Sequence, residues 1–281
     1  MADLSRVHAA LLDWYAAHGR DLPWRHTREP YAILVAEVML QQTQVERVIP
    51  KWHAWLARFP TLEALAKATR GDAIRAWEGL GYNLRAVRLH AIARQCAADC
   101  GGTLPSSVEG LRTLKGIGRY TAGAVACFAY GQPVAIVDTN VRRVLSRVFE
   151  LETRAVDGMA QRFVPVAPNE AAYKWNQALM DLGATLCRSR EPLCLVCPLL
   201  GECGGPRPRP VAAGARSNGS FHGSTRFFRG RVIGRLRQLG GAETVALDDL
   251  LAEVGASRDL VFNLASEGLL EIYDDRVRLV D

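Results

Sequence analysis

The sequence predicts an all-α protein with a small region of strands at its C-terminal end. Apolar residues recur at helical spacing along most of the chain, beginning with residues 4–19. Clusters of glycine and proline separate these segments, as expected for turns between helices. Strand-like alternation occurs in the final run LLEIYDDRVRLV, on both sides of an Asp-Asp turn.

Length and composition fit a globular protein. The 281 residues, 49% of them hydrophobic, suffice for one large domain or two modest ones. The sequence has no signal peptide, no Arg-rich leader and no run of eighteen apolar residues. We therefore expect a cytoplasmic, nucleoid-associated protein with no membrane association, and a monomer.

Positive charge is concentrated in one part of the chain. The net charge of +6 and the pI near 9.1 favour a polyanionic partner. Residues 204–241 contain eight arginines and no acid, whereas residues 242–281 contain three arginines and ten acids. The acidic balance of the last segment argues against a second strong DNA-binding surface there, because phosphate attraction scales with the number of cations.

The first helix is expected over residues 4–19, and RDLPWRHTREPY then interrupts the helical pattern. Residues 32–52 are predicted to form one long helix in which Glu37 lies among apolar residues. Burial there would raise the pKa of the carboxyl group and make it a general acid at neutral pH. The pattern equally permits a solvent-facing position for Glu37. A polar cluster that includes Gln42 follows, suited to hydrogen bonds with base edges.

Two or three further helices are expected between Phe59 and Gly102, interrupted by the motif GLGY at residues 79–82. Taken alone, Tyr82 is consistent with a core residue. In the helix that follows, Arg85 and Arg88 are expected on a solvated face.

A glycine-rich turn precedes the next helix. In LKGIGRYTAGAV, the amides of Gly116 and Gly118 can approach a phosphate because neither residue has a Cβ. A turn of this kind is common and by itself is weak evidence for phosphate binding.

An acid stands beside two cations after the apolar run PVAIV. Asp138 is expected to cap a helix that carries Arg142 and Arg143. Capping alone would explain the aspartate, while a carboxylate beside cations also suits catalysis.

Four cysteines form the strongest local signal. Their spacing is Cys187-x6-Cys194-x2-Cys197-x5-Cys203. Disulfides are disfavoured in a cytoplasmic protein, so a metal is favoured, and the spacing allows either zinc or a cubane iron-sulfur cluster. Just before them, Gly183 is expected to end a helix.

Residues 204–224 are rich in Gly, Pro, Ser and Ala and are predicted to be a flexible, strongly basic linker. Residues 225–281 show three helical patterns followed by a hairpin. This order suggests a small winged-helix-like module.

These motifs resemble those of the MutY-type adenine-specific mismatch DNA glycosylases of the helix-hairpin-helix (endonuclease III-like) superfamily. The matching motifs run in the same order over residues 4–203: PWR, EVMLQQTQV, GLGY, LKGIGRYTAGAV, VDTNVRRV, NQALMDLGA and the cysteine cluster. The chain resembles a short form that lacks the Nudix-like C-terminal domain with which typical members recognise 8-oxoguanine. This departure leaves the preferred opposing base open.

The resemblance implies two helical subdomains with a cleft between them, and a [4Fe-4S] cluster bound by Cys187, Cys194, Cys197 and Cys203. The implied organisation is a glycosylase domain at 1–203, followed by the linker at 204–224 and the module at 225–281. The glycosylase domain would consist of a six-helix subdomain at about 25–133 and a cluster subdomain of 1–24 plus 134–203.

The resemblance also implies hydrolysis of the N-glycosidic bond of adenine mispaired with 8-oxoguanine or guanine, after base flipping. Glu37 would protonate the base, and Asp138 would stabilise the oxocarbenium-like sugar or act as a transient nucleophile. Tyr120 stands where bifunctional relatives carry a Schiff-base lysine, so the enzyme would be monofunctional. Asn140 would position water and Gln177 would contact adenine. The residues expected to bind double-stranded DNA are Arg25, Gln42, Tyr82 as a duplex wedge, Gly116, Gly118, Arg142 and Arg143.

Two alternatives remain at this stage. One is a thymine or uracil mismatch glycosylase of the same superfamily. The other is a non-catalytic, metal-cluster DNA-binding regulator. The sequence does not identify a protein partner for the C-terminal module.

Overall fold

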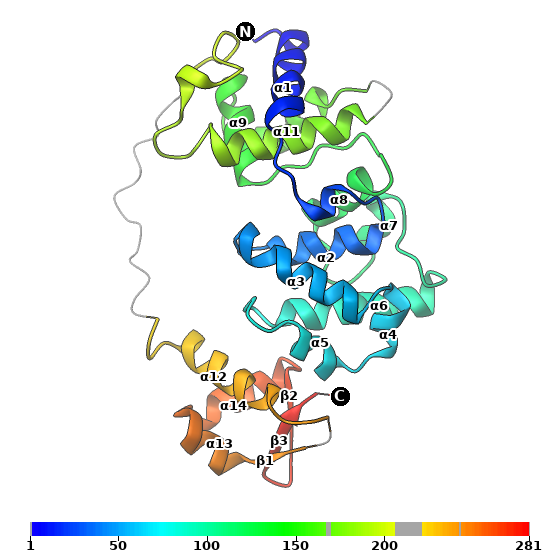
Figure 1. The fold of residues 1–281 in the computed structure, drawn as a ribbon, viewed down its shortest axis with the longest axis vertical. Helices are drawn as coiled ribbons and strands as arrows, with labels where there is room; N and C mark the ends of the chain where they lie inside the picture. The colour runs from blue at the N-terminus through cyan, green and yellow to red at the C-terminus, as the bar shows by residue number, and fades with distance from the viewer. Residues whose placement is uncertain (1, 167–169, 206–220, 242, 281) are drawn as a thin grey trace. The chain divides into compact units, whose positions relative to one another are not determined.

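The computed structural model describes residues 2–166, 170–205, 221–241 and 243–280. Within these ranges the chain forms fourteen α-helices, three short 3-10 helices and three short strands, so the predicted helical character is confirmed (Figure 1). None of the described helices is long and apolar enough to cross a membrane.

The helices group into two units by their contacts. Their bounds differ from the predicted subdomains of about 25–133 and 1–24 plus 134–203, since residues 25–33, 105–113 and 117–133 group with the cysteine region. The first unit is Met1–Ile33, Pro105–Thr113 and Ile117–Ala215, and the second is Leu34–Leu104, Leu114–Gly116 and Arg216–Asp281.

In the first unit, α11 (Ala171–Thr185) packs against both α1 (Leu4–His18) and α9 (Thr139–Val148) (Figure 1). The helix α1 begins where the sequence predicts, because the Asp3 side chain accepts hydrogen bonds from the backbone N–H groups at its start. The unit also contains η1 (Pro23–Arg25), α7 (Val108–Arg112), α8 (Arg119–Phe128), α10 (Val156–Met159), η2 (Ala160–Phe163) and η3 (Cys194–Val196).

Gly183 does not end its helix, because α11 continues to Thr185. A Cβ on Gly183 would lie 2.7 Å from the Cβ of Asn140. The glycine is therefore explained by the close approach of α11 to the start of α9.

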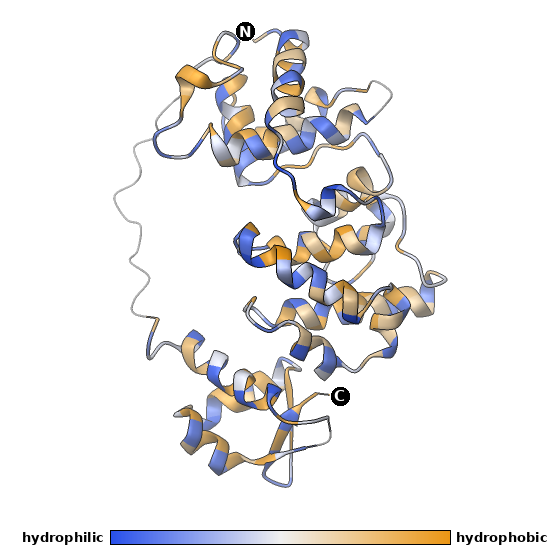
Figure 2. Cartoon of the chain, viewed as in Figure 1, coloured by the Kyte–Doolittle hydropathy of each residue, from blue (hydrophilic) through white to orange (hydrophobic). Residues whose placement is uncertain are grey.

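The single helix predicted over 32–52 is wrong. The chain forms α2 (Pro30–Leu40) and α3 (Val45–Arg58), separated by a turn in which Gln42 has a φ of 57°. A left-handed residue cannot continue a right-handed helix, so the chain changes direction there. Residues 31–39 are all buried, and α2 is coloured hydrophobic along most of its length (Figure 2).

The second unit continues with α4 (Leu62–Lys67), α5 (Arg70–Ala76) and α6 (Leu84–Asp99), and both short helices pack on α6. Threonine caps the start of each short helix. At α5 the cap is reciprocal: Thr69 accepts from the Asp72 amide, and the Asp72 carboxylate accepts from the Thr69 amide.

The C-terminal segment contains the three helices and the hairpin that the sequence predicts, together with one short extra strand. The strands form an antiparallel sheet in the order β1-β3-β2. Asp274 and Asp275, with φ of 47° and 56°, make the two-residue turn between β2 and β3. The elements are α12 (Thr225–Arg237), β1 (Val245–Ala246), α13 (Leu247–Val254), α14 (Arg258–Ser266), β2 (Leu270–Tyr273) and β3 (Arg276–Leu279).

The core of this C-terminal segment includes one residue of α5. Its buried residues, among them Val232, Leu236, Leu264 and Val277, form one hydrophobic cluster with Ile74 of α5. The segment is thereby part of the second unit.

Candidate active site and cysteine loop

Asp138 caps the N-terminus of α9. Its Oδ1 accepts a hydrogen bond from the Val141 amide at 2.6 Å, and its Oδ2 accepts one from Nδ2 of Asn140 at 3.4 Å. The carboxylate is partly buried at the positive end of a helix, which favours negative charge there.

A network of hydrogen bonds holds Asn140 beside this carboxylate. Nη2 of Arg143 donates to Oδ1 of Asn140 at 2.8 Å and to the Gly183 carbonyl at 2.7 Å, and its Nε donates to the Cys187 carbonyl at 2.8 Å. Arg143 thus joins α9, the end of α11 and the first cysteine. Arg142 is bound to Asp157 at 2.8 and 2.9 Å. Both arginines have protein partners in this structure.

Glu37 lies in the middle of α2 and is 7% exposed. This burial excludes the solvent-facing position that the sequence pattern permitted. Glu37 belongs to the second unit and Asp138 to the first. The approach of these two acids to one sugar remains a prediction.

The turn between α7 and α8 has the glycine geometry that a backbone anion site requires. Gly116 has a φ of 103°, which only glycine adopts without strain. Gly118 is the N-cap of α8, and a Cβ there would meet nothing within 4 Å. Gly118 is also exposed. Tyr120 follows in the first turn of α8 and is half-buried.

Arg85 is a residue whose importance the sequence analysis missed. The prediction that it lies on a solvated face is wrong, since it is 4% exposed. Burial lowers the pKa of its guanidinium to about 10. Its two terminal nitrogens donate at 2.7–3.2 Å to the carbonyls of Val38, Met39, Gln41, Leu80 and Gly81 and to the hydroxyl of Thr43.

These contacts connect two turns that carry predicted DNA-binding residues. Arg85 binds the carbonyls of Gln41 and Gly81, which directly precede Gln42 and Tyr82. Both of these following residues are exposed and left-handed, with φ of 57° and 47°. The sequence contains a signal for a buried donor here. The motif GLGY interrupts the helices, and the carbonyl groups at the interruption have no helical partner and need a hydrogen-bond donor such as Arg85.

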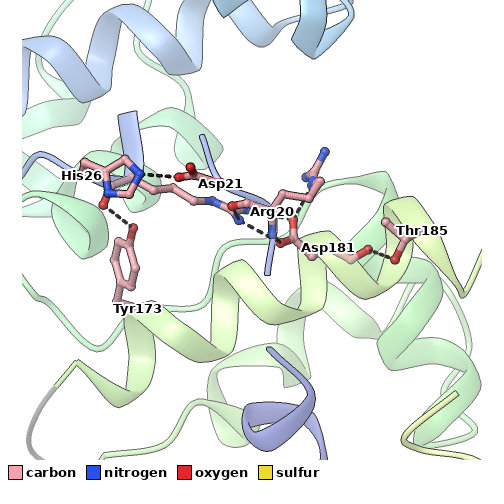
Figure 3. Close-up of polar contacts among 7 residues, drawn as sticks. Arg20, Asp21, His26, Tyr173, Asp181 and Thr185 are labelled. Carbon is pink, nitrogen blue, oxygen red and sulfur yellow. Dashed lines mark hydrogen bonds and ion pairs between the residues drawn. The ribbon is translucent and has the colours of Figure 1, made fainter. Parts of the chain in front are cut away.

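Arg25, predicted to bind DNA, lies instead inside the first unit. Nη1 and Nη2 of Arg25 each donate to one oxygen of Asp181 at 2.8 Å. Nε of Arg20 adds a third contact to the Asp181 carboxylate at 2.7 Å (Figure 3). The Asp181 carboxylate is fully buried and needs these cations. Burial opposes ionisation, but the hydrogen bonds and charges of Arg25 and Arg20 hold the pKa of Asp181 below its ordinary value. The expected phosphate contact of Arg25 is therefore corrected to a structural ion pair.

The other α11 residue singled out by the sequence, Gln177, is 5% exposed on the buried face of that helix. The hydroxyl of Tyr173, one turn earlier, donates to the Arg25 carbonyl at 3.4 Å. The helix is thus fixed by polar contacts on both sides of Gln177.

The four cysteines of the predicted cluster site are thiols that line one cavity. Burial raises the pKa of Cys197 and Cys203. Arg147 lies beside them, with Nη1 at 3.3 Å from Sγ of Cys187. Within the described ranges, no group of three or more His, Cys, Asp and Glu side chains has the geometry to coordinate a metal ion. The donor set nevertheless fits a tetrathiolate group, because four cysteines line one largely apolar cavity.

Comparison with known proteins gives consistent matches. The family described as "HhH-GPD superfamily base excision DNA repair protein" matches residues 35–168. The adenine DNA glycosylase of Mycolicibacterium smegmatis is 42% identical over 270 residues, which are 93% of this chain and 91% of that protein. The adenine DNA glycosylase of Mycobacterium tuberculosis is 44% identical, covering 81% of this chain and 77% of that protein. The human adenine DNA glycosylase is 40% identical over 80% of this chain and 43% of its own length.

Solved structures agree on the fold. A thermostable thymine-DNA glycosylase superposes with a TM-score of 0.67 and 30% identity, covering 71% of this chain and 94% of that chain. A non-covalent endonuclease III–DNA complex gives a TM-score of 0.60 at 21% identity, covering 72% and 96%. The second likeness supports the fold alone.

Proposed function

The chain belongs to the adenine DNA glycosylase family of the HhH-GPD superfamily and is a hydrolase of N-glycosyl compounds, and from this premise we propose that it excises adenine mispaired with 8-oxoguanine or guanine in duplex DNA. The observation that carries the proposal is the similarity to adenine DNA glycosylases along nearly the whole chain. The third interpretation, a non-catalytic regulator, is therefore set aside.

The chemistry requires a proton for the departing base and an anion for the sugar. Adenine is a poor leaving group until it is protonated, and positive charge develops on the sugar as the bond breaks. Glu37 would supply the proton from its buried position on α2. Asp138 would stabilise the cationic sugar, supported by the amide of α9 that it accepts from.

Asn140 is proposed to position the attacking water. Its support is the network in which Arg143 holds the Asn140 side chain next to Asp138. Tyr120 cannot form an imine, so we expect base excision without efficient β-elimination. Gln177 is proposed to contact the adenine.

The DNA itself would be held by backbone amides and by exposed side chains on the two turns that Arg85 connects. Gly116 and Gly118 would bind a phosphate. Gln42 and Tyr82 would enter the duplex while the base is flipped out, a step that costs a few kcal/mol.

The four cysteines are proposed to hold a [4Fe-4S] cluster, which would cross-link the loop that follows α11. Arg147 would offset the negative charge of four thiolates, and it also fixes the same loop by donating to the carbonyls of Arg188 and Ser189. The C-terminal module is proposed to be winged-helix-like, since the order α12-β1-α13-α14-β2-β3 combines three helices with a three-stranded antiparallel sheet.

The proposal is tested by incubating the purified protein with duplexes that contain A opposite 8-oxoG, G or C, and T opposite G, and then cleaving abasic sites with alkali. We expect cleavage at adenine opposite 8-oxoG and G, and intact strands without alkali. Asp138→Asn and Glu37→Gln should each slow excision at least about a hundredfold. Preferred cleavage at T opposite G would instead support the second candidate, which the likeness to the thymine-DNA glycosylase favours.

A further inference from the structure

Three side chains form a stack at the surface of the second unit. The guanidinium carbon of Arg226, at the start of α12, lies 5.0 Å from the ring centre of Tyr82 and 5.9 Å from that of Phe221. Tyr82 is 49% exposed and Phe221 55% exposed, and Arg226 is exposed as well. The ring of Tyr82 also has the buried guanidinium of Arg85 at 5.7 Å. Tyr82 thus stands next to two arginines from different parts of the chain.

The position of α12 beside this tyrosine is fixed at the other end of the helix. Arg237 donates from Nη2 to Oδ1 of Asn83 at 2.7 Å and from Nε to the Ile74 carbonyl at 3.0 Å. Burial lowers the pKa of this guanidinium, and Val232 and Leu236 join the hydrophobic cluster around Ile74. The helix is therefore anchored by buried polar and apolar contacts at the turn that carries Tyr82.

The stack has the composition of a nucleic-acid contact. Aromatic faces stack on bases, and arginine both binds phosphate and stacks on aromatic rings. Arg229 and Arg235 on the same helix are paired with Glu267 and Glu253. Within the described ranges Arg226 has no ion-pair partner.

The charge of the surrounding sequence supports the same ligand. Residues 204–241 contain eight arginines and no acid. Arg226 and Phe221 belong to this basic segment, and Arg226 lies beside both Phe221 and the exposed Tyr82, a combination suited to a polyanion with accessible bases.

We propose that Tyr82, Arg226 and Phe221 form one DNA-contact surface, in which the C-terminal module contributes Arg226 to binding of the strand beside the position that Tyr82 enters. The inference rests on the proposed function, because it takes Tyr82 as a DNA contact. It extends that function by giving the C-terminal module a direct share in binding mispaired duplex DNA.

The test compares Arg226→Ala with Arg235→Ala, which removes the same charge from the same helix at a residue already paired with Glu253. Fluorescence anisotropy measures the Kd of the full-length protein for a labelled duplex with one A·8-oxoG mispair, over a series of salt concentrations. Arg226→Ala should weaken binding about tenfold and reduce the slope of log K against log salt by about 0.9. Arg235→Ala should change Kd less than about threefold.

Phe221→Ala provides a second variant at an exposed position and should weaken binding without reducing the salt slope, since it removes stacking and no charge. The proposal is overturned if Arg226→Ala and Arg235→Ala bind the mispaired duplex equally well. Excision is measured separately, at saturating enzyme. If the wild-type protein binds the mispair through Arg226 but does not excise adenine, the proposed function is refuted and this inference is retained. If the wild-type protein excises adenine and Arg226→Ala binds DNA as tightly as wild type, this inference is refuted and the proposed function is retained.

Discussion

Arg85 shows how one buried cation can organise a surface that it does not itself form. Its guanidinium satisfies carbonyl groups from two turns, and within the described ranges it forms no ion pair. Its Nε is buried and has no hydrogen-bond partner. The free energy gained from five carbonyl contacts thus offsets the desolvation of a lone cation.

Replacing Arg85 by methionine should destabilise the protein by about 3 kcal/mol, because several buried carbonyls lose their donor. Arg85→Lys should recover only part of this loss, since one ammonium group cannot reach both turns. Chemical denaturation measures both variants. Arg94→Met, an exposed site on the same helix, is the matched control and should stay within about 0.5 kcal/mol of wild type. Equal stability of the Arg85 and Arg94 variants would contradict the interpretation.

Asp181 should make the stability of the protein depend on acid pH. The pKa of Asp181 is lowered in the folded protein, so its ionised form stabilises the fold. This stabilisation is fully present above the ordinary aspartate pKa of about 3.9. It is lost as the pH falls through the lowered pKa of the folded state. At neutral pH, Asp181→Asn should cost about 3 kcal/mol, because Arg25 is left buried without its partner.

The measurement is the unfolding free energy of wild type and Asp181→Asn between pH 7 and pH 3. The difference between them should remain constant down to about pH 4 and shrink below it. A difference that grows as the pH falls would show that the carboxylate does not have the lowered pKa.

Among the helices, sequence patterns located the elements better than their ends. The helix α1 and the Asp-Asp hairpin were predicted at the correct residues, because a capping aspartate and a two-residue turn are local signals. The break at Gln42 was missed because glutamine does not mark a left-handed residue. The role of Gly183 was missed for a different reason, since its neighbour Asn140 is distant in sequence.

Gly183→Ala tests how closely α11 must approach α9. The new Cβ would stand 2.7 Å from the Asn140 Cβ, and backbone atoms of Asn140 lie close behind it. The clash should outweigh the better helix propensity of alanine and destabilise the protein by about 1–2 kcal/mol. Excision should slow too, because Asn140 would move relative to Asp138.

Gly234→Ala is the control for this substitution. Gly234 lies inside α12, and a Cβ there would meet nothing within 4 Å. This variant should raise the unfolding temperature slightly, in line with helix propensity alone. Thermal unfolding and single-turnover excision distinguish the two variants, and a stabilised Gly183→Ala would refute the steric explanation.

On the scale of the whole chain, the family resemblance selected the residues of the candidate site, and their catalytic and DNA-binding roles remain predictions. Asp138, Asn140 and the four cysteines lie in one unit, with Arg143 connecting them. Arg25 shows the limit of transferring motifs, because the sequence PWR does not reveal that a carboxylate 156 residues away neutralises its arginine. The sharing of a core between α5 and the C-terminal module was equally invisible to the sequence.

Ile74→Ala should test this shared core. Ile74 is fully buried among residues of the module, so its truncation should cost about 2–4 kcal/mol. Hydrogen exchange should then speed up in both α5 and α12, because the two helices lose the same support. Faster exchange confined to α5 would indicate that the module has an independent core.

The shared core also bears on how a truncated gene product would behave. A premature stop codon after the cysteine loop would leave a polypeptide with every residue proposed for catalysis, yet without the side chains that bury Ile74 of α5. We expect such a polypeptide to be less stable than the full chain and therefore to be degraded faster in the cell.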